Sequence, residues 1–408
     1  MIVKPKIRGF ICTSAHPDGC RAQVDAMIRM LEQRLPIVGP KRVLVIGAST
    51  GYGLATRAAA AFGAGAATLG VCYERPGSER RTATAGWYNT QALEAQATKR
   101  GLYARTINAD AFSQETKQQV IDTLRRDLGP VDLVVYSLAA PRRQEADGSI
   151  STSVIKPVGS PYYGKTLDLT TNEVRDIRVE PATDEEIAAT VRVMGGDDWA
   201  AWIDCLADAG LLAPNATTLA YSYVGPSLTF AIYRDGTIGR AKDDLEHTAA
   251  CLRERYAGLR LNARVAVAKA VVTQASAAIP SVPLYITLLF AVMKRQGSHE
   301  GTAEQMFRLL SEHVYGPLGR LDDAGRYRVD DLELDPAVQH DVIARWQRVT
   351  SDNIRQLADI EGYWQDFHRL FGFGIDGVDY DRDIDLLAEN HYPGSSLGAD
   401  LEERTDSD

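Results

Sequence analysis

The 408-residue sequence has no long uninterrupted apolar run. The longest, from Val282 to Met293, is broken by Pro283 and Thr287, and it is well below the roughly 20 residues needed to cross a bilayer. The N-terminal residues MIVKPKIR contain no apolar core of the kind found in signal peptides. These absences argue against membrane insertion and secretion, and they predict that Val282 to Met293 is a core helix.

The sequence also lacks the spacings that mark disulfide frameworks, metal sites and one class of hydrolase. Its five cysteines are scattered without any Cys-x-x-Cys pair, which favours a reducing, cytoplasmic compartment. The seven histidines show no His-x-x-x-His or other ligand spacing, so no metal site is predicted. Ser49 does not lie in a Gly-x-Ser-x-Gly elbow, which argues against a hydrolase.

Positive charge is outnumbered in this chain. There are 45 lysines and arginines against 54 aspartates and glutamates, and the formal net charge is −9. That balance argues against a general nucleic-acid surface and against binding to anionic membranes. The hydrophobic fraction of 45% and the charged fraction of 24% are ordinary for a soluble globular protein.

What the sequence does contain is an alternation of strand and helix patterns from residue 43 onward. The predicted strands are Val43 to Ile46, Ala67 to Tyr73, Tyr103 to Asn108, Val131 to Ser137, Thr218 to Val224 and Ala263 to Thr273. The predicted helices are near Ala55 to Phe62, Gln91 to Lys99, Gln114 to Leu128 and Gly239 to Tyr256. This alternation predicts a Rossmann-like, doubly wound parallel sheet with helices on both faces.

We expect one large domain over residues 1–400. Its predicted parts are an N-terminal extension (1–40), a dinucleotide-binding half (41–140), an insertion forming a substrate wall or lid (141–217), a catalytic half (218–295) and a helical C-terminal part (296–400). In the extension, helical spacing predicts one buried face made of Val24, Met27, Ile28, Leu31 and Leu35. The acidic end, residues 401–408, is expected to be disordered.

A glycine-rich turn follows the first predicted strand. The segment Gly47-Ala48-Ser49-Thr50-Gly51-Tyr52-Gly53 leads into an alanine-rich helix. Glycines let the backbone approach a pyrophosphate closely, and the N–H groups of the following helix face its charge. The Gly-x3-Gly-x-Gly spacing resembles the short-chain dehydrogenase arrangement. The alternative is a plain strand-to-helix turn that needs a positive φ.

Glu74 stands at the end of the second predicted strand, roughly 20 residues beyond the glycines, where dinucleotide-binding folds place the acid that binds the adenosine ribose. A carboxylate there accepts hydrogen bonds from both ribose hydroxyls and repels a 2′-phosphate, so the sequence favours NADH over NADPH. In the opposite case Arg75, Arg80 and Arg81, which lie close by, would receive that phosphate.

Further candidate cofactor contacts follow the third and fourth strands. Asp110 would hydrogen-bond the adenine amino group with Ala111 backing the ring, while Ala139 and Ala140 leave room for the adenosine ribose and the nicotinamide half. The carboxyl ends of strands are where open α/β sheets bind ligands. Each segment alone is also compatible with a turn.

Tyr233 and Lys242 follow the fifth predicted strand, with eight residues between them. In a dinucleotide-binding enzyme such a lysine bonds the nicotinamide ribose, and its charge makes the phenol a stronger acid. Ordinary short-chain dehydrogenases have three intervening residues, and none of the seventeen tyrosines here has a lysine at that distance. The spacing therefore argues against a plain ketoreductase.

Over nearly its whole length the chain resembles the FabV-type trans-2-enoyl-acyl carrier protein reductases and the related trans-2-enoyl-CoA reductases. The motifs that carry the resemblance are KPKIRGF at 4–10, AHPDGC at 15–20, the glycine loop, MGGDDW at 194–199, the Tyr-x8-Lys pair, VTQAS at 272–276 and FGF at 371–373. The resemblance implies an NADH-dependent, generally monomeric enzyme. Such an enzyme saturates the α,β double bond of an enoyl thioester on acyl carrier protein or coenzyme A, in the last step of fatty-acid elongation.

The resemblance also implies roles for single residues. It assigns the pyrophosphate to Gly47, Ala48, Ser49, Thr50, Gly51 and Tyr52, the adenosine ribose to Tyr73 and Glu74, adenine to Asp110 and Ala111, the ribose and nicotinamide side to Leu138, Ala139 and Lys242, and the nicotinamide amide to Val271, Val272 and Thr273. Tyr233 would be the proton donor and Tyr223 a substrate contact.

The expected reaction follows from the chemistry of a conjugated thioester. Hydride adds to the β carbon, and negative charge develops on the thioester oxygen as an enolate. The phenol of Tyr233 or of Tyr223 would meet that charge. The proton reaches the α carbon either directly from Tyr233 or through the enol, and the sequence leaves both routes open.

Several alternatives also remain open at the level of sequence. Ile279 to Phe290 is expected to be one wall of an apolar acyl channel or else ordinary core. Arg142 and Arg143 would attract an acidic carrier protein or the phosphates of coenzyme A, or else they are merely solvated. The alternative functions are a carbonyl reductase with unusual tyrosine-lysine geometry and a non-catalytic NADH sensor.

Overall fold

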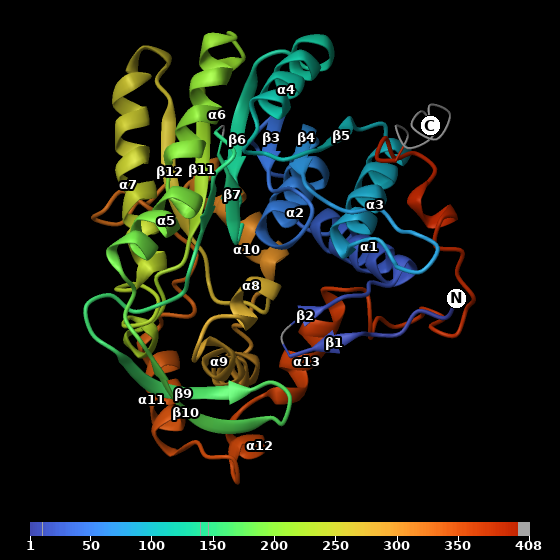
Figure 1. Ribbon diagram of the computed structural model, residues 1–408. Helices are drawn as coiled ribbons and strands as arrows, with labels where there is room; N and C mark the ends of the chain where they lie inside the picture. The colour runs from blue at the N-terminus through green and yellow to red at the C-terminus, as the bar shows by residue number, and fades with distance from the viewer. Residues whose placement is uncertain (10, 139, 146, 399–408) are drawn as a thin grey trace.

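The computed structural model describes residues 1–9, 11–138, 140–145 and 147–398. A seven-stranded parallel sheet occupies the upper part of Figure 1, in the order β13, β12, β11, β6, β3, β4, β5. The strands are β3 (Arg42–Ile46), β4 (Ala67–Cys72), β5 (Ala104–Asn108), β6 (Val131–Tyr136), β11 (Leu212–Ser222), β12 (Asn262–Val267) and β13 (Tyr327–Arg328). The predicted doubly wound α/β fold is confirmed.

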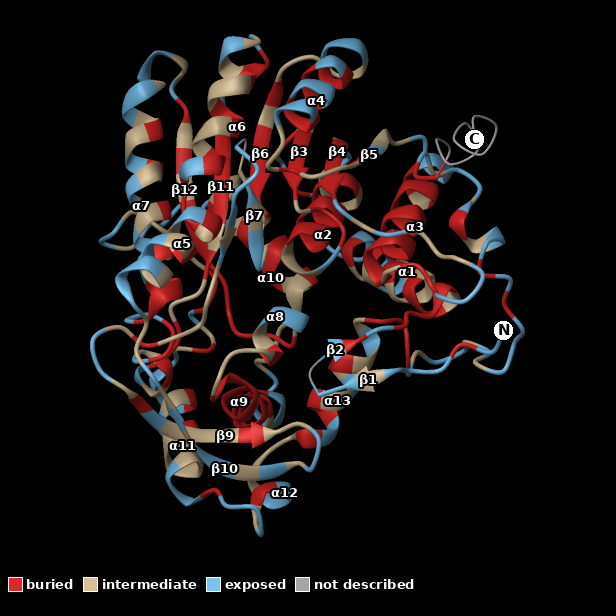
Figure 2. Cartoon of the chain, viewed as in Figure 1, coloured by how far each residue is buried: buried red, intermediate tan, exposed pale blue. Residues whose placement is uncertain are grey.

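Helices cover both faces of the sheet because side chains along each strand alternate between the faces. On β3, Val43 and Val45 point into one apolar cluster, whereas Leu44 and Ile46 point into the other. The first face is covered by α1 (Pro17–Glu32), α2 (Gly51–Ala58), α3 (Ala85–Lys99) and α10 (Thr302–Arg308), and the second by α4 (Gln114–Asp127), α6 (Asp197–Asp208) and α7 (Thr237–Arg255). Figure 2 shows the buried strands between helices whose outer sides are exposed.

The chain between β6 and β11 adds two antiparallel hairpins and a helix. The hairpins are β7 (Arg142–Gln144) with β8 (Ile150–Thr152) and β9 (Tyr162–Asp168) with β10 (Glu173–Val179), and the helix is α5 (Asp184–Met194). A capping box begins α5: the Glu186 N–H donates to Thr183 Oγ1 at 3.2 Å, and the Thr183 N–H donates to the Glu186 carboxylate at 3.0 Å. In Figure 1 the β9–β10 hairpin lies at the lower end of the molecule, beside α9.

A second core surrounds α9 (Val282–Gln296), which is buried along almost its whole length. Around it pack the short helix α8 (Gln274–Ala277), α11 (Pro336–Arg348), α12 (Ile354–Leu357) and α13 (Ile360–Arg369), together with the N-terminal hairpin of β1 (Ile7–Arg8) and β2 (Ile11–Cys12). The prediction of a core helix over Val282 to Met293 is confirmed. None of the helices described has both the length and the apolar character needed to span a bilayer.

Four details differ from the sequence-based expectations. Leu35 is 86% exposed because α1 ends at Glu32, so the buried face stops at Leu31. Strand β11 begins at Leu212, six residues early, with a register shift before Thr217. Strand β12 ends at Val267 rather than Thr273, and β13 carries no recognisable strand pattern because it is only two residues long. The expected disordered tail at 401–408 lies outside the described residues.

A buried ion pair joins α4 to α6. The Lys117 ammonium donates to Asp198 Oδ1 at 2.8 Å and to the carbonyl oxygens of Ala111 and Phe112 at 3.2 and 3.1 Å. The hydroxyl of Tyr136 donates to the other Asp198 oxygen at 3.1 Å. Both charged side chains are only 2% exposed. Asp198 belongs to the MGGDDW motif, whose buried carboxylate thereby fixes the loop after β5.

Replacing Lys117 with Met should lower the free energy of unfolding by about 3–5 kcal/mol, because it leaves the Asp198 charge buried without its partner. Denaturant unfolding measures this loss. The matched control is Arg126→Met on the same helix, which removes a solvent-exposed pair with Asp127 and should leave the unfolding midpoint unchanged. Equal effects of the two substitutions would contradict the structural role of the buried pair.

Candidate active site

The glycine loop turns sharply between β3 and α2. Gly47 has φ +85°, and a Cβ added to Gly53 would lie 1.9 Å from the Gly47 carbonyl oxygen, so the two backbones touch. Gly51 has φ +54°, and no atom lies within 4 Å of an added Cβ there. The space before the first turn of α2 is therefore open to a ligand, and N–H groups face it. This cradle fits a pyrophosphate.

The side chain of Tyr52 leaves the loop. Its hydroxyl donates to the Lys269 carbonyl oxygen, and its ring packs beside Tyr221 at 5.9 Å between centroids. Only the backbone of Tyr52 is thus available to the phosphate groups that the sequence assigns to Gly47–Tyr52. The phenol instead connects the loop to the segment after β12.

Glu74 is held in place at the end of β4. Its backbone N–H donates to Asn108 Oδ1 at 2.6 Å, and Asn108 Nδ2 donates to the Glu74 carbonyl oxygen at 2.8 Å. Ser49 of the glycine loop donates to the Glu74 carboxylate at 2.6 Å. A Cβ on Gly86 would lie 2.1 Å from that carboxylate. The acid therefore lies beside the phosphate cradle, as a ribose-binding acid must.

The adenine candidates lie next along the same sheet edge. Asp110 Oδ1 accepts the Phe112 N–H at 2.9 Å, which shapes the loop after β5, and Ala111 is buried. Leu138 is half-buried after β6, and Ala139 lies outside the described residues. The Tyr73 side chain is 80% exposed.

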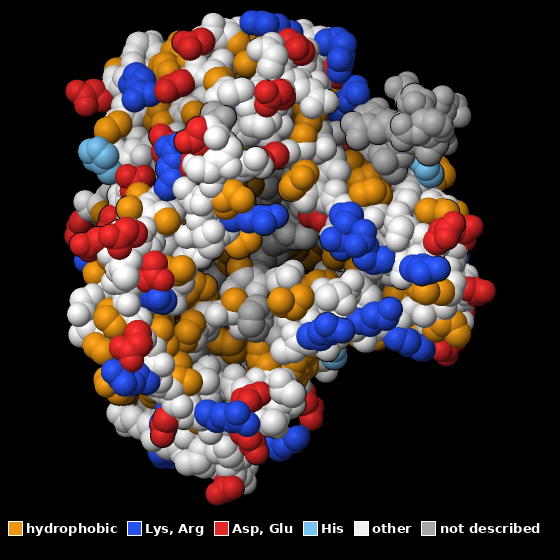
Figure 3. Space-filling view, in the orientation of Figure 1, with side chains coloured by type: hydrophobic (Ala, Val, Ile, Leu, Met, Phe, Trp, Pro, Cys, Tyr) orange, Lys and Arg blue, Asp and Glu red, His pale blue; other side chains and the backbone are white. Residues whose placement is uncertain are grey.

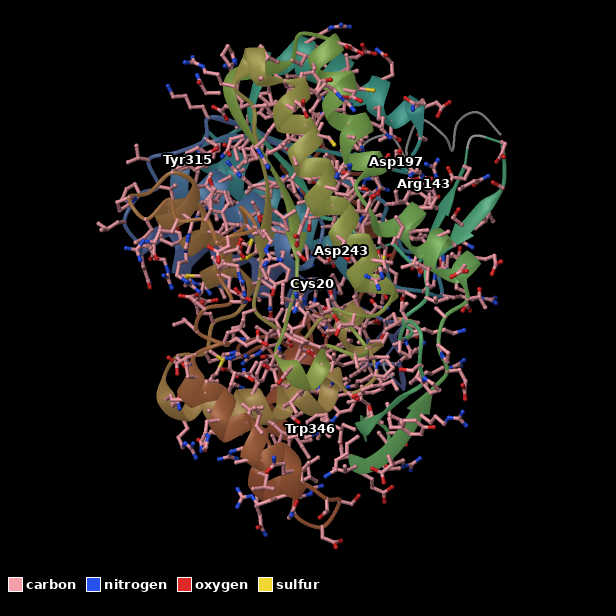
Figure 4. All side chains as sticks on the ribbon, turned by 90° about the vertical axis from the view of Figure 1, so that its left-hand side faces the viewer. Cys20, Arg143, Asp197, Asp243, Tyr315 and Trp346 are labelled. Atoms are coloured by element: carbon pink, nitrogen blue, oxygen red, sulfur yellow. The ribbon has the colours of Figure 1, made fainter. Side chains whose placement is uncertain are left out.

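Arg143 is enclosed by neighbouring side chains. Its guanidinium donates to Asp197 at 3.1 Å and to the Arg192 carbonyl oxygen at 3.2 Å, and it covers the Phe112 ring at 5.3 Å. Figure 4 shows Arg143 beside Asp197. The side chain is 11% exposed, and its charge is paired with the carboxylates of Asp197 and Glu145. Arg142 is exposed.

Tyr233 lies in the turn before α7 and is 8% exposed. Its backbone carbonyl accepts the Gly239 N–H at 3.0 Å, and a Cβ on Gly239 would lie 1.6 Å from the Arg234 carbonyl oxygen. This glycine lets α7 start directly against the turn. Tyr223 meets Tyr233 edge to face, with 5.0 Å between ring centroids, so the structure brings the two predicted tyrosines together. Burial raises the pKa of the Tyr233 phenol above its ordinary value, which keeps its proton in place.

Lys242 lies one turn inside α7. Its ammonium donates to the Tyr221 carbonyl oxygen at 2.9 Å, at the end of β11. Burial lowers the pKa of Lys242 to about 8. Among the described residues no hydrogen bond joins Lys242 to Tyr233, and burial alone accounts for the shifted pKa of each group.

The segment Val271–Thr273 follows β12 at the same edge. Val271 and Val272 are buried, and Thr273 caps α8 by accepting the Ser276 N–H at 3.0 Å. Ser276 in turn donates its hydroxyl to the Val271 carbonyl at 2.9 Å. The backbone of this segment is therefore fixed by local hydrogen bonds.

Sequence reasoning missed two buried charged residues beneath this site, Lys269 and Glu333. The Glu333 carboxylate accepts hydrogen bonds from the hydroxyls of Tyr223 and Tyr285 at 2.9 and 2.7 Å and from the Ala270 N–H at 2.7 Å. A lysine inside the apolar run AVAKAVV was a visible signal for Lys269. No such signal marks Glu333, because it lies in an acidic stretch that is expected to be exposed to solvent.

The site lies in a hollow. Figure 3 shows that this face of the molecule is hollowed between the sheet and the region of β9, β10 and α9, with hydrophobic side chains around the hollow. A glycine-rich turn, a carboxylate held beside it, a buried tyrosine and a buried lysine follow the strands of a parallel sheet, which is the arrangement expected of an NAD-type oxidoreductase.

The comparisons with known proteins identify the family. The model described as "Trans-2-enoyl-CoA reductase catalytic region" matches residues 81–315, and "NAD(P)H binding domain of trans-2-enoyl-CoA reductase" matches residues 2–79. The chain is 53% identical to the enoyl-[acyl-carrier-protein] reductase [NADH] of Saccharophagus degradans, covering 94% of this chain and 98% of that protein. It is 52% identical to the trans-2-enoyl-CoA reductase [NADH] of Ruminiclostridium cellulolyticum, covering 95% and 98%.

A solved structure agrees with these relatives. The trans-2-enoyl-CoA reductase of Treponema denticola in complex with NAD superimposes with a TM-score of 0.91 at 47% identity, over 94% of this chain and 98% of that one. The chain belongs to the trans-2-enoyl-CoA and enoyl-acyl carrier protein reductase family, and it is an NADH-dependent enoyl-thioester reductase. The predicted family, activity and cofactor are confirmed, and neither the carbonyl reductase nor the non-catalytic sensor is retained.

One family description names a flavin. "Enoyl reductase FAD binding domain" matches residues 321–384. In that segment Val338, Val342, Tyr363 and Phe367 on α11 and α13 are buried in the core around α9, so none of these apolar side chains is available to contact a flavin ring. No step of the reaction is assigned to a flavin.

Replacing Gly53 with Ala should raise the Kd for NADH about 10-fold or more, a loss of about 1.4 kcal/mol, because the new Cβ pushes the Gly47 carbonyl out of the cradle. Titration of NADH fluorescence measures it. Gly65→Ala is the control: Gly65, unlike Gly53, has a positive φ, and an added Cβ there meets nothing within 4 Å. It should cost stability and leave NADH affinity unchanged. Normal affinity in the Gly53 variant would contradict the assignment of the cradle.

Proposed function

We propose that the residues at the carboxyl edge of the sheet divide the reduction of the enoyl double bond between them. The observation that carries this proposal is the edge-to-face pair of Tyr223 and Tyr233. The cradle from Gly47 to Tyr52 holds the pyrophosphate, and Glu74 holds the adenosine ribose. When bound, NADH supplies the hydride that adds to the β carbon.

Asp110 and Ala111 bind the adenine, Tyr73 lies beside the adenosine ribose, and Leu138 lies on the ribose and nicotinamide side. Val271, Val272 and Thr273 present backbone groups to the nicotinamide amide. Their position after the shortened strand β12 supports this assignment, because backbone N–H and C=O groups beyond a strand end are free of sheet pairing. The Lys242 ammonium bonds the nicotinamide ribose, replacing its bond to the Tyr221 carbonyl.

Tyr233 meets the charge that develops on the thioester oxygen and supplies the proton that the product gains. Its buried phenol stays protonated at neutral pH and donates from Oη. The Tyr223 proton already lies in a hydrogen bond to Glu333, so Tyr223 offers the substrate its ring and its oxygen lone pairs rather than a second donor. We therefore assign the enolate contact to Tyr233.

The insertion after β6 supplies a substrate wall. Tyr162, Ile177 and Val179 of the β9–β10 hairpin share an apolar cluster with Tyr233 and Ile279. A groove of about 400 Å³ runs between this hairpin and the α8–α9 turn. Ile279, Pro280 and Pro283 line it, whereas most of α9 beyond Leu284 is ordinary core. We place the acyl chain along this groove.

We also propose that the enzyme is cytoplasmic and monomeric. All five cysteines are free, which suits a reducing cytoplasm. The exposed large hydrophobic residues are scattered over the chain from Met1 to Leu387, which suits a monomer. Light scattering of the purified protein measures its mass, and a dimer mass would overturn the monomer.

The wild-type enzyme should oxidise NADH with crotonyl-CoA or a longer trans-2-enoyl thioester, and mass spectrometry should find the saturated thioester. Tyr233→Phe should lower kcat by about 10²–10⁴-fold, because the proton donor is lost. Its Kd for NADH should stay within about threefold of wild type. Parallel assays with enoyl-acyl carrier protein compare the two carriers.

Tyr163→Phe is the control for this substitution. Tyr163 lies on β9 beside the proposed wall but is 69% exposed, so its variant should have wild-type turnover. Wild-type turnover in the Tyr233 variant, with a large loss in Tyr223→Phe, would transfer the donor role to Tyr223.

The kcat/KM for NADH should fall as pH rises through about 8, since the Lys242 ammonium with a pKa of about 8 loses its charge there. Below that pH the lysine is charged and binds the cofactor. Lys242→Arg should abolish the fall, because an arginine stays protonated at every pH tested. Burial also lowers the pKa of Lys269 to about 8. If kcat/KM still falls near pH 8 in the Lys242→Arg variant, the fall is due to Lys269 instead.

A further inference from the structure

Glu333 lies in the turn between β13 and α11 and is completely buried. Its carboxylate is saturated with donors: one oxygen accepts the hydroxyls of Tyr223 and Tyr285, and the other accepts the Ala270 N–H. Burial raises the pKa of this carboxyl, while the nearby Lys269 charge and the three donors act in the opposite direction. A carboxylate with three donors is a fixed point in an otherwise apolar core.

The two oxygens of Glu333 hold two different parts of the site. Through Tyr223 the carboxylate fixes the ring that packs edge to face on Tyr233. Through the Ala270 N–H it fixes the residue immediately before Val271–Thr273. One side chain from the C-terminal part thus sets the distance between the substrate tyrosines and the proposed nicotinamide segment.

The backbone around Ala270 is held by side chains on every side. The Lys269 ammonium donates to the Ala270 carbonyl at 2.8 Å, while the N–H of Ala270 donates to Glu333. The Lys269 N–H donates to Gln305 Oε1 at 2.7 Å, and the Lys269 carbonyl accepts the Tyr52 hydroxyl. Side chains have replaced the strand partners that β12 loses after Val267. The segment is therefore rigid without being part of the sheet.

We infer that Glu333 is a positioning residue of the reductase: it holds Tyr223 and the Ala270 peptide on one carboxylate and so sets the alignment of the substrate with the hydride donor. The inference rests on the proposed roles of Tyr223 and Val271–Thr273. Glu333 is 0% exposed, and its carboxylate bonds only protein groups among the described residues. It acts through the geometry of Tyr223 and the Ala270 peptide.

Glu333→Gln tests this inference, because an amide group cannot accept hydrogen bonds on both sides. The NH2 group of the glutamine would face either the Ala270 N–H or the two tyrosine hydroxyls, and it cannot accept a hydrogen bond from them. Turnover per NADH-binding site, with sites counted by fluorescence titration, should fall about 10- to 100-fold, as expected for a misalignment of about 1 Å. The KM for the enoyl thioester should change by less than about threefold.

Tyr285→Phe is the matched control. It removes one hydrogen bond from the same carboxylate oxygen and leaves Tyr223 and Ala270 bound, so its turnover per site should remain within about threefold of wild type. Wild-type turnover in Glu333→Gln, or equal losses in the two variants, would overturn the inference. Because turnover is divided by the number of NADH-binding sites, unfolded protein does not affect the comparison.

Glu333→Asp covers the case in which the glutamine variant does not fold. It keeps the charge but withdraws the carboxylate by one carbon–carbon bond, about 1.5 Å, so it can reach only one of its two targets. A loss of turnover per site like that expected for glutamine supports the inference, and wild-type turnover overturns it. Failure of the proposed residue roles would look different: Tyr233→Phe would then be as active as wild type, whatever the Glu333 variants do.

Discussion

The parallel pairing of β3 with β6 is the contact on which the site depends. Ile46 pairs with Tyr136 at the carboxyl end of both strands, and the chain leaves the two strands toward opposite edges of the sheet. A crevice necessarily opens where neighbouring connections diverge. Here the glycine loop closes on Ser137, whose carbonyl oxygen would lie 2.3 Å from a Cβ on Gly47. Every other part of the cofactor site is arranged around that crevice, and the second core around α9 forms its lower wall.

Local chemistry explains which features could be predicted from the sequence. Strands that are buried on both faces have continuous apolar sequences, so the sequence predicts β3, β4 and β6 almost to the residue. The glycine loop and the acid after β4 are predictable too, because each is marked by its residue type directly after a predicted strand. Helix ends are harder to predict from sequence. Leu35 continues the apolar spacing of α1, yet the helix ends at Glu32. The last residues before Thr273 looked like strand because they are buried and β-branched, yet side chains rather than a neighbouring strand satisfy their backbone.

Long-range contacts explain what could not be predicted. Arg143 reads as a solvated charge, and only the fold shows that Asp197 and Phe112 enclose it. The assignment of Glu333 needed three partners that lie 110, 63 and 48 residues away in the chain. A buried carboxylate in an acidic stretch has no local signature, because its burial is decided by elements elsewhere. Through Glu333 the C-terminal part is therefore connected to the proposed active site.

The recess that holds Glu74 bears on how cofactor preference changes in evolution. The carboxylate occupies the place where any residue other than glycine at position 86 would put its side chain, and Ser49 of the phosphate loop binds it. The acid, the serine and the glycine are thus packed as one unit. With Glu74 as the proposed ribose-binding acid, accommodating a phosphorylated ribose would require changes in the glycine loop, at the end of β4 and at the start of α3 together.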